Sequence, residues 1–328
     1  MLLAAGVALG GCAAATEAAG PPTVQATAIT LGDHPLNEAM LGPLRFEAGF
    51  ALHSTDPRFG GLSGLWLAPD GGRMLAVSDH GTLWSVELES DANGRLTGLA
   101  GWQAIEPGAA PGDPPGRDAE ALASSGPDGL VIAYEGVHRL RRLGLADPTA
   151  PATALPTPQG LGPPSDTGIE ALAELEDGAL LALSEGAFTS KGDLAGWRIE
   201  GGRTQPLTYA VSLGFVPTGA DRLGDTIYVV ERSFSLLSGF QSRIVTLPAA
   251  AVRPGARLIG EVLAELHPPL VGENFEGIAV RRGGDGRVLL YLVSDDNFFA
   301  LQRTLLLQFS LPGSGPLAQR AGAARASN

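Results

Sequence analysis

Five segments of this chain share one layout, and a chain built from such repeats has few folds open to it. In the clearest copies an acid precedes a short apolar run, a turn containing Asp-Gly follows, and a second apolar run ends at another acid. In residues 275–297, Glu276 precedes the first run, Asp295 follows the second, and the turn lies at 283–286. The layout recurs at 168–186, 118–136 and 60–81, with a weaker copy at 218–233. The chain is therefore expected to be a repeat array.

Each repeat is predicted to form a β-hairpin, in which the start of the first strand lies beside the end of the second. The midpoint of residues 276 and 295 falls inside the turn, so Glu276 and Asp295 are expected to meet at the end of the hairpin away from the turn. The corresponding pairs are Glu170 with Glu185, Glu120 with Glu135 and Ser63 with Asp79, and Glu231 closes the weaker copy. Paired carboxylates repel, which raises the pKa of one of them unless a cation is nearby.

Two further strand-like runs follow most hairpins, which makes about four short strands per unit. The closing acids are 46 to 64 residues apart. Four-stranded units of this length are typical of an all-β fold, the β-propeller, with five blades counted here and six possible. A β-sandwich is the alternative, but it does not explain the recurring acids. The last unit lacks a fourth strand, and residues 44–53 are predicted to supply it and so close the ring.

Composition limits the kinds of partner. The chain is 44% apolar and 17% charged, with 46 Gly and 25 Pro, which suits a large core and many turns. Its 22 basic and 35 acidic residues give a net charge of −13, which argues against nucleic acid as a partner. An acidic chain is compatible with metal cations or cationic ligands.

The N-terminus carries a targeting signal. An apolar run leads to Leu9-Gly10-Gly11-Cys12, which resembles the lipobox of bacterial lipoproteins, where the cysteine is lipidated. We expect a signal peptide at 1–11, a lipidated Cys12 and flexible tether at 12–35, the propeller at 36–313 and a disordered tail at 314–328. A plain secretory signal is the alternative. The resemblance, with Ala13 after the cysteine, implies a protein of the cell envelope on the periplasmic side of the outer membrane, in contact with the bilayer only through its lipid. We expect the protein to be a monomer.

In a propeller the repeated acids converge on one mouth of the central channel. They must be neutralised by arginines, metal ions or protons. The acids expected at this mouth are Asp79, Glu120, Glu135, Glu170, Glu185, Glu231, Glu276 and Asp295.

Several motifs resemble the phytase-like domain family, also described as "esterase-like activity of phytase". They lie at residues 59–65, 78–81, 168–172, 230–233, 275–279 and 293–304. The resemblance covers roughly 59–311, and one departure is Ala121, where the family usually has Gly after the Glu. It implies an extracytoplasmic propeller that hydrolyses phosphate or carboxylic esters.

A ring of Asp and Glu oxygens suits a hard cation, most plausibly Ca²⁺. The expected metal ligands are Asp79, Glu120, Glu135, Glu170, Glu231, Glu276 and Asp295. Glu170, Glu185 and Arg232 are the expected catalytic residues. Arg58, Arg232, Arg303 and Asn297 are the expected binding residues for a small ester or phosphate substrate. Two alternatives stay open: the acids are structural pegs paired with arginines, or the propeller is a non-catalytic platform that binds a protein, glycan or metal.

Overall fold

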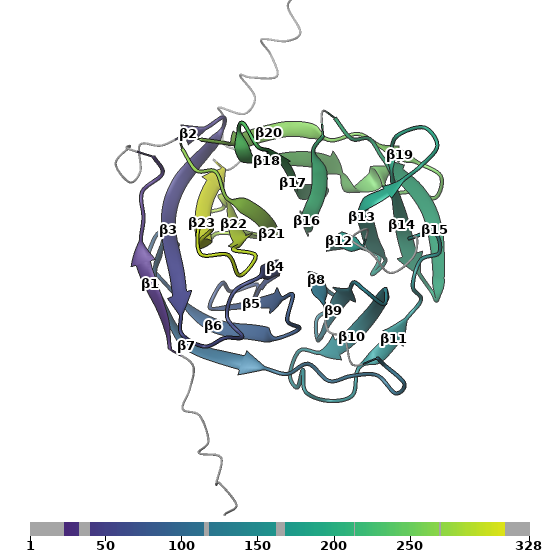
Figure 1. The fold of residues 1–328 in the computed structure, drawn as a ribbon, viewed down its shortest axis with the longest axis horizontal. Helices are drawn as coiled ribbons and strands as arrows, with labels where there is room; N and C mark the ends of the chain where they lie inside the picture. The colour runs from purple at the N-terminus through teal and green to yellow at the C-terminus, as the bar shows by residue number, and fades with distance from the viewer. Residues whose placement is uncertain are drawn as a thin grey trace, which may run out of the picture.

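Five β-sheets stand around a central axis like the blades of a fan (Figure 1). This computed structural model describes residues 23–32, 40–114, 118–161, 168–212, 214–268 and 270–311. Within those ranges the regular structure is β-strand apart from one short 3-10 helix, η1 (Ala249–Ala251). The prediction of a five-bladed β-propeller is confirmed. The interval from 231 to 276, where a sixth blade could have been hidden, contributes strands to blades 4 and 5 and one short edge strand to blade 3.

The first three blades follow one another along the chain. Blade 1 consists of β4 (Leu62–Leu67), β5 (Arg73–Ser78), β6 (Leu83–Ser90) and β7 (Leu96–Ile105). Blade 2 consists of β8 (Ala119–Ser124), β9 (Gly129–Tyr134), β10 (Arg139–Gly144) and β11 (Thr153–Leu155). Blade 3 consists of β12 (Ile169–Glu174), β13 (Leu180–Phe188), β14 (Leu194–Glu200) and β15 (Arg203–Tyr209), with β19 (Arg257–Leu258) added in parallel at its edge.

Blade 5 contains strands from both ends of the chain. Blade 4 consists of β16 (Val216–Leu223), β17 (Thr226–Ser235), β18 (Gly239–Pro248) and β20 (Glu261–Leu266). Blade 5 consists of β21 (Asn274–Arg282), β22 (Val288–Asp295), β23 (Thr304–Leu311), β3 (Leu44–Ser54) and β1 (Val24–Ala28), with β2 (Met40–Leu41) also paired to β3. Within the described ranges, no helix has the length and apolar character needed to cross a bilayer.

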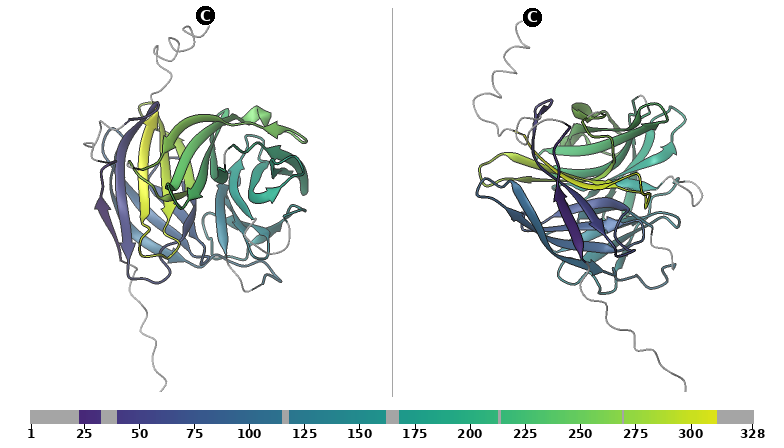
Figure 2. Two further views of the ribbon diagram at one scale, coloured as in Figure 1. Left: turned by 45° about the horizontal axis from the view of Figure 1, so that its top comes forward. Right: turned by 60° about the vertical axis from the view of Figure 1, so that its left-hand side comes forward.

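The ring is closed by the N-terminal part of the domain. β3, purple in Figures 1 and 2, lies antiparallel to the yellow β23, with Thr304 opposite Leu52, so the predicted closing strand at 44–53 is confirmed. One boundary was misplaced, because residues 24–28 were expected in the flexible tether and instead form β1 on the outer edge of β3. The side chains of β1 are mostly exposed, and backbone pairing with β3 holds the strand in place. A strand of this kind leaves no apolar pattern in the sequence.

Every innermost strand carries a β-bulge near its start. In β4, Leu62 lies opposite Ser78 and Gly64 lies opposite Val77, so Ser63 is the extra residue. The register breaks at the same place in the other four blades. A bulge turns the side chain of its extra residue out of the usual alternation. The five bulge residues are Ser63, Glu120, Glu170, Thr218 and Glu276.

Small residues follow the bulges because the innermost strands come very close to one another. A Cβ on Gly219 would lie 2.1 Å from the carbonyl oxygen of Glu276 in the next blade, and one on Gly64 would lie 2.6 Å from the amide of Leu122. In blade 2 this place is taken by Ala121, which is buried. The cavity left between these strands has a volume of only about 10 Å³, room for one water at most. The middle of the channel is closed, so a ligand can reach the site only from outside.

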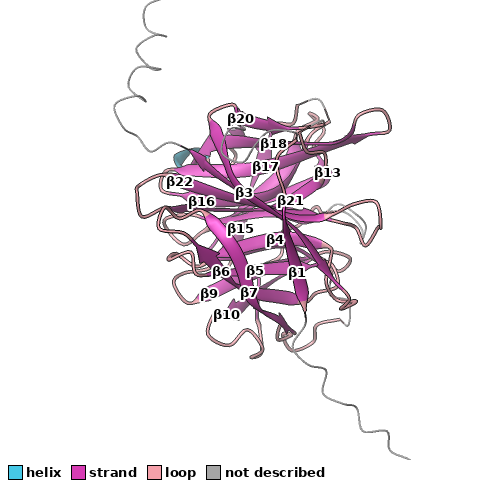
Figure 3. Cartoon of the chain, turned by 90° about the vertical axis from the view of Figure 1, so that its left-hand side faces the viewer, coloured by secondary structure: helices cyan, strands magenta, loops and turns pink. Residues whose placement is uncertain are grey.

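Apolar side chains fill the spaces between neighbouring blades. Between blades 5 and 1, Phe59 packs edge-on against Trp84, with ring centroids 5.1 Å apart, and also against Trp102. A similar cluster joins blades 4 and 5. Figure 3 views the ring edge-on and shows the strands of successive blades stacked across it. Each fully buried large side chain contributes about 1.5–3 kcal/mol, so these layers hold the innermost strands in fixed positions.

Candidate functional site at the channel mouth

Two sets of side chains meet at the end of the channel where the innermost strands begin, called here the mouth end. The first set is the five bulge residues. The second set contains one residue from each hairpin. It is the residue that follows the one opposite the residue before the bulge: Asp79, Glu135, Glu185, Arg232 and Asp295. Together these ten residues form what we call the acidic mouth. Seven of them are carboxylates and one is a guanidinium, which gives a formal charge of −6.

Blade 4 departs from the prediction. Its register places Glu231 opposite Pro217, one residue short of the mouth position, and Arg232 takes that position instead. Successive residues of a strand point to opposite faces, so Glu231 points away from the mouth. Its carboxylate accepts a 2.5 Å hydrogen bond from the Tyr209 hydroxyl and forms an ion pair with Arg243. Glu231, expected as a metal ligand, therefore lies outside the acidic mouth.

The bulges also change which residues face one another. Asp295 pairs in register with Asn274, and Ser294 pairs with Phe275, while Glu276 is the unpaired bulge residue. Glu276 is therefore not directly opposite Asp295, the residue it was expected to meet at this end of the hairpin. Their side chains still converge, because the buried Asn274 amide donates to Glu276 Oε1 at 2.8 Å and to Asp295 Oδ2 at 3.0 Å. Asn274 was not anticipated from the sequence.

One side of the mouth is organised around Arg232. Its guanidinium donates to Glu185 Oε2 at 2.8 Å, to Glu276 Oε1 at 3.0 Å and to Asn274 Oδ1 at 2.8 Å. These partners come from blades 3 and 5, so the arginine of blade 4 links its two neighbours. Arg232 offsets part of the negative charge on this side of the mouth, since one guanidinium faces two carboxylates.

The other side of the mouth carries a second group of carboxylates. Oxygens of Asp118, Glu120 and Glu135, all in blade 2, lie within 4.8 Å of one another. Asp79 accepts a 2.6 Å hydrogen bond from the Ser63 hydroxyl. Asp118 was also not anticipated, although it occupies the same position in blade 2 that Asn274 occupies in blade 5. Among the described residues, no arginine or lysine pairs with Asp79, Glu120, Glu170 or Asp295.

Burial and mutual repulsion raise the pKa values of several of these acids. Burial raises the pKa of Asp79 to about 7, and the charge of Glu276 adds to the effect. Burial raises the pKa of Asp295 to about 8, again with Glu276 contributing. The pKa values of Glu120 and Glu170 are also raised, chiefly by burial and then by neighbouring carboxylates. Near neutral pH the mouth therefore holds either protons or a cation.

The expected substrate-binding residues include three arginines, and all three are paired with acids. The Arg58 guanidinium binds Asp56, with Nη2 2.6 Å from Oδ2. Arg303 Nε donates to Glu273 at 2.7 Å. The side-chain amide of Asn297 bonds within its own loop. Of the four residues, only Arg232 lies in the acidic mouth.

An aromatic side chain borders Asp79. Asn297 and Phe298 both have positive φ angles, 47° and 49°, which non-glycine residues seldom adopt. This backbone lays the Phe298 ring flat on His80, with centroids 3.9 Å apart. The same ring approaches Gly61, where a Cβ would lie 2.6 Å from Phe298 and 2.8 Å from Asp79 Oδ2. Phe298 therefore forms one wall of the mouth.

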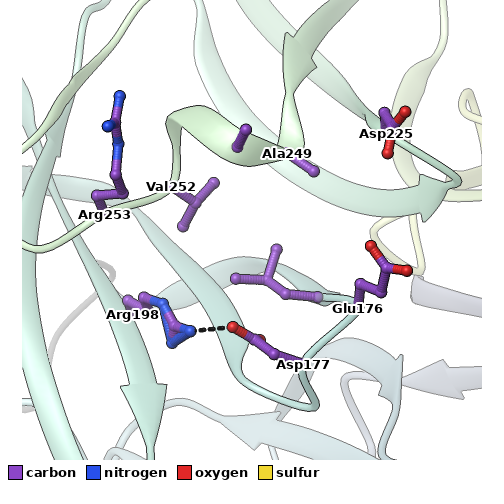
Figure 4. A pocket seen from close by; sticks show the side chains of 9 residues that line it. Glu176, Asp177, Arg198, Asp225, Ala249, Val252 and Arg253 are labelled. Carbon is purple, nitrogen blue, oxygen red and sulfur yellow. Dashed lines mark hydrogen bonds and ion pairs between the residues drawn. The ribbon is translucent and has the colours of Figure 1, made fainter.

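The larger hollows of the molecule lie at the opposite end, among the hairpin turns. One of about 480 Å³ is lined by Glu176, Asp225 and Arg253, with Arg198 bound to Asp177 (Figure 4). Another, of about 590 Å³, lies between the turns of blades 1, 2 and 3. Asp177 in the first hollow belongs to a turn, and it accepts the backbone amide of Ala179 as turn aspartates commonly do. The clustered, buried acids with raised pKa values are at the mouth end, which makes the mouth the better functional candidate.

Comparison with curated protein sequences found no significant match. Among solved structures, the chain is similar to the endo-arabinase from Bacteroides thetaiotaomicron (13% identity, TM-score 0.46, covering 79% of this chain and 96% of that one). It is also similar to the PQQ-bound aldose sugar dehydrogenase from Streptomyces coelicolor (14%, 0.40, 89% and 99%). A third match is the Swd1 β-propeller domain of Myceliophteria thermophila (10%, 0.40, 89% and 100%). Likenesses this distant carry no argument about activity.

A family comparison is more informative. The model of a family described as "Phytase-like: Esterase-like activity of phytase" matches residues 57–298. The matched segment contains all ten residues of the acidic mouth and most of the five blades. The chain belongs to this phytase-like family.

Proposed function

We propose that this protein is a divalent-cation-dependent ester hydrolase whose reaction takes place at the acidic mouth. The observation that supports this best is the convergence, among the described residues, of seven buried or partly buried carboxylates with one arginine at the mouth end of the five blades. Charges packed this way need a cation or protons, and a cation also attracts an anionic substrate.

Calcium fits the donor set. Ca²⁺ binds oxygen ligands at about 2.3–2.6 Å, so two ligands on one ion lie no more than about 5 Å apart. The oxygens of Asp118, Glu120 and Glu135 meet this limit, since all lie within 4.8 Å of one another. The acidic mouth contains no histidine or cysteine, which disfavours zinc and copper and favours a hard cation.

A bound calcium ion would supply Lewis acidity and positive charge for a phosphate oxygen. The protein's own groups divide the remaining tasks. Arg232 offers a guanidinium suited to phosphate oxygens and is held in place by Glu185 and Glu276. Asp79, oriented by the Ser63 hydroxyl and with a pKa raised to about 7, is suited to accept a proton from water near neutral pH.

The mouth also limits how a substrate binds. The channel below it is closed, so an ester must approach from outside with its reacting group pointing inward. Glu170, expected as a catalytic residue, is only 4% exposed and lines the small cavity inside the channel. Its proposed role is therefore to hold negative charge beneath the cation rather than to touch the substrate.

The proposed substrate class is a phosphate ester. A carboxylic ester is tested beside it, because the family description names both phytase and esterase. Hydrolysis of p-nitrophenyl phosphate and p-nitrophenyl acetate, each in EDTA and in excess calcium, separates the two. Glu120→Gln should weaken calcium binding at least about tenfold and reduce turnover in parallel. Glu176→Gln, an exposed carboxylate at the other end of the channel, is the control.

Turnover that is the same in EDTA and calcium, or that survives Glu120→Gln, would refute the proposal. Absence of turnover on both substrates, together with saturable calcium binding, would favour a non-catalytic platform at the cell envelope. Exposed apolar side chains around the mouth favour this second candidate.

A further inference from the structure

Exposed apolar side chains gather on the face that surrounds the acidic mouth. Eleven large apolar residues are exposed in the part of the chain that the structure describes. Eight of them lie where the second strand of a blade turns into the third, and those turns are all at the mouth end. Six of these eight are called here the apolar rim: Phe188, Phe234, Leu236, Leu237, Phe299 and Leu301.

The hairpin between β17 and β18 extends beyond the ring. β5 ends at Ser78, whose equivalent in blade 4 is Glu231, yet β17 continues for four more residues to Ser235. At about 3.3 Å per residue, the hairpin reaches roughly 13 Å past that level. Leu236 and Leu237 form its tip and are 95% and 102% exposed. Phe234 packs against Phe240 below them, with ring centroids 4.8 Å apart, which stiffens the hairpin.

The N-terminal segment joins the domain on this same face. β1 runs antiparallel to β3 with Val24 opposite Ser54, the end of β3 that leads to the mouth. Cys12, expected from the sequence to be lipidated, is eleven residues before Thr23. Eleven residues span at most about 40 Å. A lipid at Cys12 would therefore keep this face, rather than the opposite one, near the bilayer.

The charges of this face do not favour anionic lipids. Two of its exposed arginines, Arg58 and Arg303, are paired with Asp56 and Glu273. The mouth itself is acidic. Contact with a bilayer must then depend on insertion of apolar side chains, which does not require negatively charged headgroups.

We propose that the apolar rim inserts into the surface of a zwitterionic bilayer and that the acidic mouth thereby faces the lipid headgroups. The protruding leucines penetrate furthest, and Phe188, Phe299 and Leu301 contact the headgroup region from neighbouring blades. The proposal concerns orientation and docking, and it does not depend on the hydrolytic reaction.

Vesicle flotation tests this docking without the lipid anchor. A chain beginning at Thr23 contains every strand of the closed ring and lacks Cys12. It should float with phosphatidylcholine vesicles. Leu236→Ser with Leu237→Ser should lower the partition coefficient at least about tenfold, since burial of each leucine is worth more than a factor of ten. Both side chains are fully exposed, so circular dichroism should show an unchanged fold.

A matched control is Ile259→Ser with Val262→Ser. This control removes two exposed apolar side chains at the start of β20, the outermost strand of blade 4. It should leave flotation unchanged. Three results would overturn the proposal. They are no flotation with phosphatidylcholine, binding that requires phosphatidylglycerol and is lost in high salt, and self-association in solution that the leucine changes abolish. The last result would make this face an interface between copies of the chain.

Discussion

Without a bound cation, the domain should lose stability as the pH rises from 5 to 8. Asp79 has an ordinary value of 3.8 and a folded-state pKa raised to about 7 by burial. The folded state therefore binds this proton more tightly than the unfolded state does. The contribution of Asp79 is fully present below about pH 3.8, declines as the pH rises, and is lost once the pH passes 7. Asp295, with a pKa raised to about 8, extends the loss to that pH.

The magnitude follows from the pKa values. Each pKa unit is worth about 1.36 kcal/mol. Between pH 5 and 7 Asp79 accounts for two units, or about 2.7 kcal/mol, and between pH 5 and 8 Asp295 accounts for three, or about 4 kcal/mol. The two groups repel each other, so the shifts share a cause and do not add. From these two groups together we expect the free energy of unfolding to fall by about 3–5 kcal/mol. That loss lowers the Tm by roughly 6–10 °C for a domain of this size.

Calcium should reverse part of this loss at pH 8. A ligand at 100 times its Kd stabilises the folded state by about 2.7 kcal/mol. At pH 5 protons compete for the same oxygens, so the stabilisation should be much smaller. Asp221, at the other end of the channel, also has a pKa raised to about 7 by burial. Asp221 therefore also makes the folded state less stable as the pH rises. Calcium bound at the mouth should not remove this contribution.

The assay is thermal unfolding followed by circular dichroism at pH 5, 6, 7 and 8, in EDTA and in calcium. Asp79→Asn should flatten the slope in EDTA, and Glu176→Gln should leave it unchanged. A Tm in EDTA that rises between pH 5 and 8 would contradict this prediction. It is equally refuted if calcium stabilises the domain as much at pH 5 as at pH 8.

Three other changes probe the architecture of the mouth. Arg232→Met leaves Glu276 without its cation and should lower the free energy of unfolding by about 3–5 kcal/mol in urea titrations; a loss below 1 kcal/mol would mean that the network contributes little. Glu231→Gln removes the partner of the buried Arg243 and should cost about 3 kcal/mol, but it should leave the calcium-induced rise in Tm intact, because Glu231 is outside the mouth. Gly219→Ala forces a Cβ against the Glu276 carbonyl and should cost at least about 2 kcal/mol or prevent folding; wild-type stability would show that the two strands can separate easily.

The fold could be predicted because its signals are local. Alternating apolar runs, Asp-Gly turns and the regular spacing of the units identify four-stranded blades without knowledge of any long-range contact. Closure by residues 44–53 followed from a strand count, since the last unit lacked one strand. β1 could not be found in this way, because an exposed edge strand held by backbone pairing has no apolar periodicity.

The site could be predicted as a region but not residue by residue. Counting to the midpoint of a hairpin assumes that each residue has one partner, and a bulge in every innermost strand breaks that assumption. In blade 4 this one-residue error selected Glu231 instead of Arg232. The small residue that follows each bulge, such as Gly219 or Gly277, could have indicated where the register shifts. A single sequence does not show why that residue must be small.

The pairing of acids elsewhere in the molecule helps to separate a structural role from a functional one. Outside the mouth, five acids that are buried or nearly so each form an ion pair with an arginine: Glu231 with Arg243, Glu47 with Arg287, Glu273 with Arg303, Asp193 with Arg257 and Asp113 with Arg141. Asp221 is held instead by the backbone amides of Arg222 and Val280. The five paired acids fit the role of structural pegs. Among the described residues, Arg232 is the arginine that pairs with acids of the acidic mouth, and it lies on one side. If Asp79, Glu120, Glu170 and Asp295 were pegs as well, an arginine would be expected beside each of them, and the described part of the chain places none there. This difference supports the proposal that a cation binds at the mouth.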